Sequence, residues 1–193
     1  AQDVTVSGGL SLTSRYISDG LTNSADNPAL QGYVELEASG FYAGAWASNV
    51  DGFGEDSELD LYFGYRGEFG QGISYDIGYA RYLYDNSGDC CGEIILSMGV
   101  PLMGDTVTLT PSIAYDPQSE ISDTSLTVDY ALSDKIGIAG SYGKVSSSHI
   151  YNSIGASYGL TDKSTVDLTY HNSNIEKGRL VLSLSYDTTL FSR

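Results

Sequence analysis

Cysteine, proline and basic residues are all scarce in this chain of 193 residues. The two cysteines, Cys90 and Cys91, are adjacent, which excludes a disulfide scaffold and the spaced ligands of a zinc site. Nine Lys and Arg stand against 25 Asp and Glu, a net charge of −16, so the chain has few groups that could neutralise phosphates. We therefore expect no nucleic-acid partner, and no motif indicates a cofactor or a metal centre.

Long hydrophobic runs are missing as well. No segment approaches the roughly 18 to 20 consecutive apolar residues of a membrane helix. This does not exclude a membrane location, because the strands of a membrane barrel are apolar on only one face. The chain opens on Ala1-Gln2-Asp3 without Met, as expected after cleavage of a signal peptide, so we expect an exported protein. Residues 1–193 fit one domain, since nothing in them resembles a linker.

What the chain does have is an alternation of apolar and polar residues, with a period of two, almost from end to end. Near its end, for example, Leu182 and Leu184 alternate with Ser183 and Ser185. This is the pattern of strands with one apolar face, and the abundant glycine suits tight turns between them. The alternation predicts twelve strands, at residues 4–16, 31–38, 41–50, 57–69, 72–84, 93–101, 106–116, 123–132, 135–144, 149–160, 164–172 and 179–190.

The predicted connections alternate in length. Tight turns fall at residues 39–40, 70–71, 102–105, 133–134 and 161–163, and longer polar loops at 17–30, 51–56, 85–92, 117–122, 145–148 and 173–178. Short periplasmic turns and longer extracellular loops are typical of outer-membrane barrels. We therefore predict an all-β fold, a transmembrane antiparallel up-and-down β-barrel in the bacterial outer membrane. Its partners would be the lipid bilayer and lipopolysaccharide, and the protein would be a monomer.

A soluble β-sandwich is the main alternative fold, because its strands alternate too. The aromatic residues favour the barrel, since a sandwich has no reason to sort them by height and aromatic rings with a polar tip prefer the membrane interface. On the apolar parity they fall into a periplasmic group, Phe41, Phe69, Tyr75, Tyr130, Tyr158 and Tyr186, and an outer group, Tyr16, Tyr79, Tyr115, Tyr142 and Tyr170.

Several segments resemble a known family, the TorF-like porins, which are also called the Gcw_chp family of bacterial outer-membrane proteins. The resemblance is carried by LTSRY at residues 12–16, DGLT at 19–22, PALQG at 28–32, GFYAGAWASNVD at 40–51, YDIGY at 75–79 and YLY at 82–84. Beyond these segments the similarity lies mainly in the alternation. The resemblance implies an outer-membrane location and a porin role, without chemistry for individual residues.

The polar parity of the strands is expected to line the barrel, where acids outnumber bases. Lumen charges tune selectivity. The sequence therefore predicts a porin for small polar solutes that prefers cations or the cationic ends of zwitterions. The predicted pore-lining or solute-binding residues are Arg15, Glu35, Glu37, Tyr42, Trp46, Asp60, Tyr62, Arg66, Glu68, Asp76, Tyr82, Asp129, Asp167 and His171.

Tyr33, Tyr84, Glu93 and Arg179 share this inward parity. Aromatic faces beside carboxylates can hold an organic amine by cation–π attraction together with charge. Two other readings of the interior stay open. The acids either pair with the arginines and fill a plugged structural barrel, or they form a ligand-binding barrel without conductance.

Three smaller features also leave alternatives. The acidic loops at residues 51–56 and 85–89 either bind Ca²⁺ or are simply solvated. Cys90 and Cys91 either form a disulfide or are free thiols. An outer-membrane phospholipase would need a Ser/His pair, and His171-Asn172-Ser173 and His149 beside residues 146–148 offer one. Because neither histidine has an evident orienting partner, we expect a protein that is not an enzyme.

Overall fold

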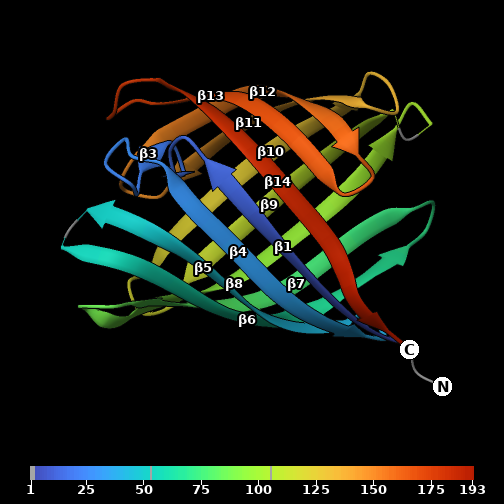
Figure 1. Ribbon diagram of the computed structural model, residues 1–193, viewed down its shortest axis with the longest axis horizontal. Coiled ribbons are helices and arrows are strands. Elements are labelled where there is room, and N and C mark those ends of the chain that lie inside the picture. Colours follow the sequence, from blue (N-terminus) through green and yellow to red (C-terminus); the bar gives the residue numbers. More distant parts are fainter. Residues whose placement is uncertain (1–2, 53, 105) are drawn as a thin grey trace.

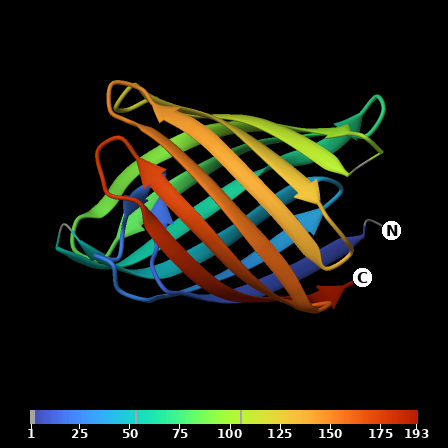
Figure 2. The same ribbon diagram turned by 90° about the horizontal axis from the view of Figure 1, so that it is seen from above.

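The computed structural model describes residues 3–52, 54–104 and 106–193. In these ranges twelve long antiparallel strands form one closed ring (Figures 1 and 2), so the predicted twelve-stranded barrel is confirmed. The ring runs in chain order from β4 to β14 and closes through β1, which pairs with both. Its strands are β1 (Val4–Thr13), β4 (Ala29–Ala38), β5 (Phe41–Gly52), β6 (Glu55–Phe69), β7 (Ile73–Tyr84), β8 (Gly88–Leu102), β9 (Val107–Asp116), β10 (Ile121–Ala131), β11 (Ile136–Val145), β12 (Ile150–Thr161), β13 (Ser164–Ser173) and β14 (Arg179–Ser192).

Some predictions concern residues beyond the described ranges. Residues 1, 2, 53 and 105 lie outside the described ranges. They belong to the expected cleavage site at the start of the chain, to the 51–56 loop and to the 102–105 turn. Within the described ranges no helix is long and apolar enough to cross a membrane.

The apolar side chains of the strands face outward and the polar ones face inward, the reverse of a soluble protein. Leu10 and Leu12 of β1 are 61% and 56% exposed on the outside, whereas Thr13 is buried. Lipid is the environment that favours such an exterior, and a closed ring leaves no unpaired strand edge in it. The barrel therefore lies in the bacterial outer membrane, as predicted.

The start of β1, the end of β14 and the short turns lie at one end of the barrel, which is the periplasmic end in proteins of this architecture (Figure 2). The turn between β4 and β5 shows how tight these connections are. Ser39 and Gly40 have φ values of 53° and 85°, and two successive positive φ values match the twist of the strands that a two-residue hairpin joins. The longer connections lie at the opposite, outer end.

One predicted girdle residue is wrong. Tyr115, Tyr142 and Tyr170 are exposed on the exterior, but Tyr16 lies inside, with its ring centroid 5.5 Å from that of Trp46. The physical reason is that β1 ends at Thr13 instead of residue 16. Thr13 Oγ1 donates a hydrogen bond to the Arg15 carbonyl at 2.8 Å, and this turn takes the chain out of the wall, so the alternation no longer tells inside from outside.

The wall extends further outward at β5 to β8 than the sequence predicts. β6 begins at Glu55 and β8 at Gly88, inside segments that we expected to be loops. Gly88 pairs with Tyr84 across a register shift near Leu83. The 51–56 and 85–92 segments are therefore largely continuations of the strands.

Candidate functional site

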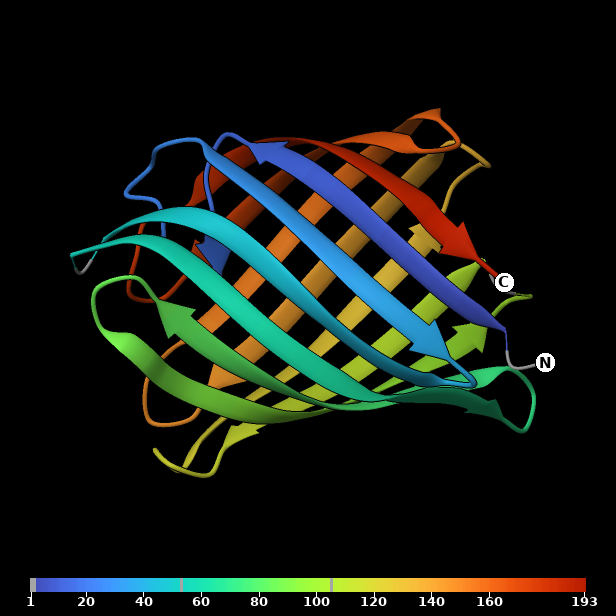
Figure 3. The ribbon, with the colours of Figure 1, turned by 60° about the horizontal axis from the view of Figure 1, so that its bottom comes forward.

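The first outer connection folds into the barrel. It contains a small hairpin of β2 (Ile17–Ser18) and β3 (Leu21–Thr22), which turns at Asp19 and Gly20 with φ values of 50° and 77°. Figure 3 shows this hairpin within the ring of strands, near its outer end. Residues 17–30 are a long outer connection, as predicted, but its fold into the lumen was not foreseen, because a two-residue strand is too short for alternation to place it.

The tip of the hairpin is held by β12, β13 and the segment before them. His149 is 5% exposed, and its ring has Nε2 2.8 Å from the Asp19 carbonyl and Nδ1 2.8 Å from Ser148 Oγ. With Nε2–H donating to the carbonyl, Nδ1 accepts from Ser148. A Cβ atom at Gly20 would lie 2.7 Å from Tyr151 Cβ and 3.0 Å from the Asn172 carbonyl, so only glycine fits there.

The root of the hairpin is held by charge. Asp26 accepts hydrogen bonds from Arg179 and from Arg15, the latter at 3.2 Å, and Lys177 Nζ lies 3.4 Å from it. The Arg179 hydrogen bond, aided by the charges of Arg179 and Lys177, lowers the pKa of the Asp26 carboxyl. Nearby, Ser24 is fully buried and accepts from the Tyr16 N–H at 2.9 Å. Arg15, Lys177 and Arg179 thus hold the root of the hairpin.

Asp19 at the tip meets carboxylates instead of bases. Partial desolvation, together with the charges of Asp123 and Glu93, raises the pKa of Asp19 to about 6. His149 and Tyr151 oppose this shift. Tyr151 also donates a hydrogen bond of 2.7 Å to Asp123. The hairpin is therefore tied by charge at its root and meets repulsion at its tip.

The two halves of the lumen wall differ in chemistry. Strands β4 to β8 carry most of the aromatic and acidic side chains of the lumen, while the other strands carry many small hydroxyls. Those hydroxyls bond to one another across neighbouring strands, with Oγ distances of 2.7 Å for Ser141 and Ser153 and 3.0 Å for Ser185 and Ser11. The side chains that can bind a charged group are therefore concentrated on β4 to β8.

Arg66 organises the periplasmic half of the aromatic wall. Its guanidinium lies 3.1 Å from Glu35 and 3.2 Å from Glu37, and Nε lies 3.7 Å from Asp76. The same group sits 4.0 Å above the centre of the Tyr42 ring, and Tyr42 donates a hydrogen bond of 2.5 Å to Asp76. Five of the predicted lumen residues thus form one cluster, and it borders a cavity of about 610 Å³ that Glu68 also lines.

A second acidic group lies toward the outer end, without a base. It contains Asp60, Glu93 and Glu58, which is 4% exposed. Tyr82 donates a hydrogen bond of 2.7 Å to Glu93, but Glu58 Oε2 and Asp60 Oδ1 are buried and have no hydrogen-bond partner among the described residues. The sequence analysis missed Glu58, although it lies two residues before Asp60 on the same parity.

The remaining predicted lumen residues are not brought together. Tyr62 stands beside Tyr42, with ring centroids 6.1 Å apart. Asp167 accepts a hydrogen bond of 2.7 Å from Thr169, and His171 pairs across the ladder with Arg179. Asp129 lies near the periplasmic end of β10, opposite Thr108. These four do not form one site.

The acidic outer segments hold each other. Asp85 Oδ1 accepts from the N–H groups of Asp56 and Ser57 at 2.9 and 3.0 Å, which lowers the pKa of Asp85. Glu55 in turn accepts from the Asn86 and Ser87 N–H groups. In residues 3–52, 54–104 and 106–193, no three His, Cys, Asp or Glu side chains are grouped to hold a metal ion.

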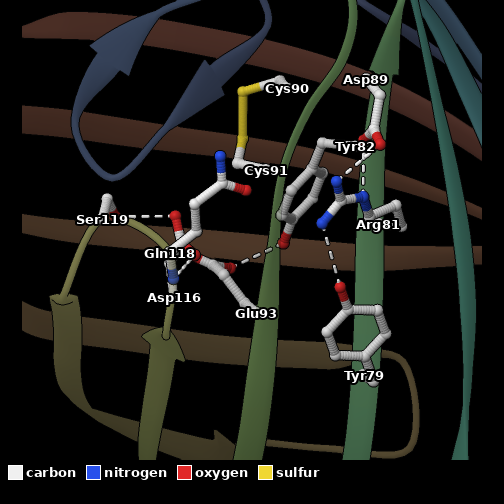
Figure 4. The surroundings of a disulfide bond; sticks show 10 residues. All are labelled: Tyr79, Arg81, Tyr82, Asp89, Cys90, Cys91, Glu93, Asp116, Gln118 and Ser119. Carbon is white, nitrogen blue, oxygen red and sulfur yellow. Dashed lines mark hydrogen bonds and ion pairs between the residues drawn. A yellow bond between two sulfur atoms is a disulfide. The ribbon is translucent and has the colours of Figure 1, made fainter.

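Cys90 and Cys91 form a disulfide, which Figure 4 shows beside Tyr82 and Glu93. The pair occupies the irregularity at which the register of β7 and β8 shifts. Just before it, Asp89 is bound by Arg81 through two hydrogen bonds. Of the two alternatives, the structure therefore contains the disulfide.

Within residues 106–193 the structure shows no hydrogen bond between His171 and Ser173, the candidate Ser/His pair at the end of β13. Ser173 Oγ accepts a hydrogen bond from the Glu176 N–H at 3.0 Å and so closes the following loop. His149 does bond to Ser148, but its other nitrogen holds the hairpin. Ser173 and His149 therefore each have a structural role.

The chain is similar in fold to solved porins. The KdgM porin superposes with a TM-score of 0.73 at 12% identity, over 93% of this chain and 98% of that one. The KdgM porin in complex with disordered oligogalacturonate gives 0.69 at 11% identity, over 94% and 98%. The NanC porin gives 0.62 at 11% identity, over 96% and 99%. At these identities the likeness establishes the fold.

Curated protein sequences include none that matches this chain. A family model does match, described as a bacterial protein of unknown function (Gcw_chp), and it covers residues 1–178. The resemblance read from the sequence is confirmed in this respect, while the relation to TorF stays a prediction. The chain belongs to the Gcw_chp family.

Proposed function

We propose that this protein is a porin that passes small polar solutes and prefers cations, including the cationic ends of amines and zwitterions. The observation that supports it is the pairing of charges in the lumen. Arg66 is bound by Glu35 and Glu37, and Arg179 by Asp26 and Glu176. No base faces the Glu58, Asp60 and Glu93 group among the described residues, so the wall offers uncompensated negative charge, which attracts cations.

This distribution separates the protein from one of the porins that share its fold. That porin was solved with oligogalacturonate, a chain of sugars that each bear a carboxylate. An anionic oligomer would meet unpaired carboxylates here. We therefore do not expect acidic sugars to be preferred solutes of this chain.

Single-channel recording in a planar bilayer tests the proposal. Under a KCl gradient we expect a reversal potential of the sign that K⁺ selectivity gives. The double substitution Glu58→Gln with Asp60→Asn should lower the cation-to-anion permeability ratio, because it removes the group without a base. Asp134→Asn, in an exposed periplasmic turn, is the matched control and should leave the ratio unchanged. Anion selectivity of the unmodified protein would refute the proposal.

The hairpin in the lumen favours a second candidate, a ligand-binding barrel that does not conduct. The two differ in one measurement, since such a barrel would stay closed even when the hairpin is displaced. We also expect no esterase activity toward phospholipids in detergent, where hydrolysis would support the phospholipase alternative. Ultracentrifugation in detergent would test the expected monomer.

A further inference from the structure

The registers of seven strands place aromatic and acidic residues in one continuous row across the lumen wall. Each member faces the next directly across the ladder. Starting on β14 and passing through β1, β4, β5 and β6 to β7, the row reads Asp187, Gly9, Tyr33, Trp46, Asp60 and Tyr82. At its end Tyr82 faces Cys91 and donates a hydrogen bond to Glu93 of β8.

This row climbs along the barrel. Ladder hydrogen bonds run perpendicular to strands that are about 4.8 Å apart, and the strands of such barrels tilt by about 40° from the axis. The five steps from Asp187 to Tyr82 therefore rise by about 15 Å, half the thickness of a bilayer core. Asp187 lies in the periplasmic half of β14 and Tyr82 near the outer end of β7, so the row connects the two halves of the lumen.

Open space lies beside the lower part of the row. A cavity of about 190 Å³ is lined by Trp46, Tyr33 and Asp187, together with Gln31 and the hydroxyls of Ser11 and Ser185. Tyr33 donates a hydrogen bond of 2.9 Å to Asp187 and so fixes that carboxylate. Gly9 permits this approach, because a Cβ atom there would collide with both side chains.

At the upper part of the row, Asp60 and the neighbouring Glu58, two residues before it, have an incomplete set of hydrogen bonds. Glu58 is 4% exposed and its Oε2 has no partner among the described residues, and the same holds for Oδ1 of Asp60 on the same face. Buried acceptors without donors are costly. A group that brings several donors and a positive charge would relieve both carboxylates.

We propose that the row is a binding track for linear aliphatic amines, such as diamines and polyamines. An ammonium group brings three donors and a charge for Asp187, Asp60 or Glu58. The aromatic faces of Tyr33 and Trp46 hold the methylene stem between the carboxylates and attract the charge as it passes. No basic residue stands in the row, so anions find no partner on it. The inference rests on the proposed function and names the solute.

Trp46 makes the track directly observable, because it is the only tryptophan of the chain. In detergent-solubilised protein, we expect spermidine to change Trp46 fluorescence in a saturable way, whereas a neutral trisaccharide and glutarate do not. Asp187→Asn and Asp60→Asn should each raise the apparent Kd for spermidine about tenfold or more, since each removes a charge-assisted hydrogen bond. Asp162→Asn, in an exposed periplasmic turn, is the control and should bind as the unmodified protein does.

A second readout separates the track from the channel. Spermidine should interrupt single-channel KCl current, and Asp187→Asn should shorten these interruptions while KCl conductance persists. A cation-selective channel whose current and Trp46 emission ignore spermidine would overturn the track and leave the proposed function standing. Saturable binding in a barrel that does not conduct would overturn the porin and keep the site. Equal fluorescence responses to the amine, the sugar and the anion would also overturn the track.

If Asp187→Asn fails to give a folded barrel, Tyr33→Phe tests the same point. It keeps the aromatic face and removes the hydrogen bond that fixes Asp187. We expect weaker spermidine binding with an unchanged near-ultraviolet circular dichroism signal from Trp46. Unchanged spermidine affinity would count against the track.

Discussion

Gly20 offers the sharpest test of whether the hairpin controls the lumen. At this position a Cβ atom would lie 2.7 Å from Tyr151 Cβ and 3.0 Å from Ser173 Cβ, so Gly20→Val forces the tip away from β12 and β13. Overpacking of this kind costs about 1–3 kcal/mol. Since each 1.4 kcal/mol is a factor of ten, the balance between seated and released hairpin should shift toward release by about 5- to 150-fold.

Gly54→Val is the matched control. Gly54 has a φ of 81°, close to the 77° of Gly20, but nothing lies within 4 Å of its Cβ position. Both substitutions therefore carry the same backbone cost of a side chain at positive φ, about 1–2 kcal/mol. Only Gly20→Val adds the collision with the wall, so the difference between the two variants isolates the seating of the hairpin.

Two measurements report the shift. Single-channel conductance should rise in Gly20→Val and not in Gly54→Val, because the hairpin occupies the outer part of the lumen. Trypsin should cut after Arg15 faster in Gly20→Val, with cleavage after Lys163, in an exposed periplasmic turn, as a reference within the same digest. Equal conductance and equal cleavage at Arg15 in both variants would refute the idea that the tip contact keeps the hairpin in place.

The remaining predictions concern pH, lipid and redox state. Asp19 has a pKa of about 6 when seated and near 4 when released, so rising pH favours release between about 4 and 6 and has no further effect above. Conductance should therefore increase between about pH 4 and 6. Water in the lumen screens the charge of Asp19 and so limits the size of this increase. Asp19→Asn should flatten it. A profile that Asp19→Asn leaves unaltered would contradict this assignment. Asp26 acts oppositely, because its pKa is lowered and its ion pairs are lost as pH falls below about 4. In the wall, Leu182→Arg should destabilise the barrel in lipid by about 2–4 kcal/mol, measured by urea unfolding, whereas Ser183→Arg, which faces the lumen, should cost clearly less. Equal losses would contradict the assigned faces. For the cysteines, mass spectrometry should find no alkylation before reduction and two adducts afterwards, and adducts without reductant would show free thiols.

The sequence alone was enough for the architecture of the wall. A strand that is half in lipid and half in water must alternate, so Leu182, Ser183 and their neighbours carry their orientation in their chemistry. Turn residues such as Ser39-Gly40 mark where the chain reverses. For the same reason the inward placement of Glu35, Trp46 and Asp60 followed from parity, and Glu58 was within reach of the same rule.

The hairpin was beyond such reasoning. Ile17–Ser18 and Leu21–Thr22 are too short to show a period. Their position depends on His149, which is distant in the chain, and on Asp26, which belongs to the same connection. Which acids meet a base was equally hidden, since Arg66 finds Glu35 on a strand two positions away in the ring. Alternation tells which way a side chain points but not what it meets.

Thus the sequence by itself determined a membrane barrel, its strand number, the end at which its turns lie and the side that each wall residue faces. Only the tertiary structure decided that the β2–β3 hairpin folds into the outer lumen and that a row links Asp187, Trp46 and Asp60. The physical reason is register. A slide of one strand by two residues keeps every side chain on its own face, so alternation cannot detect it. It would nevertheless set Trp46 opposite a different neighbour and break the row.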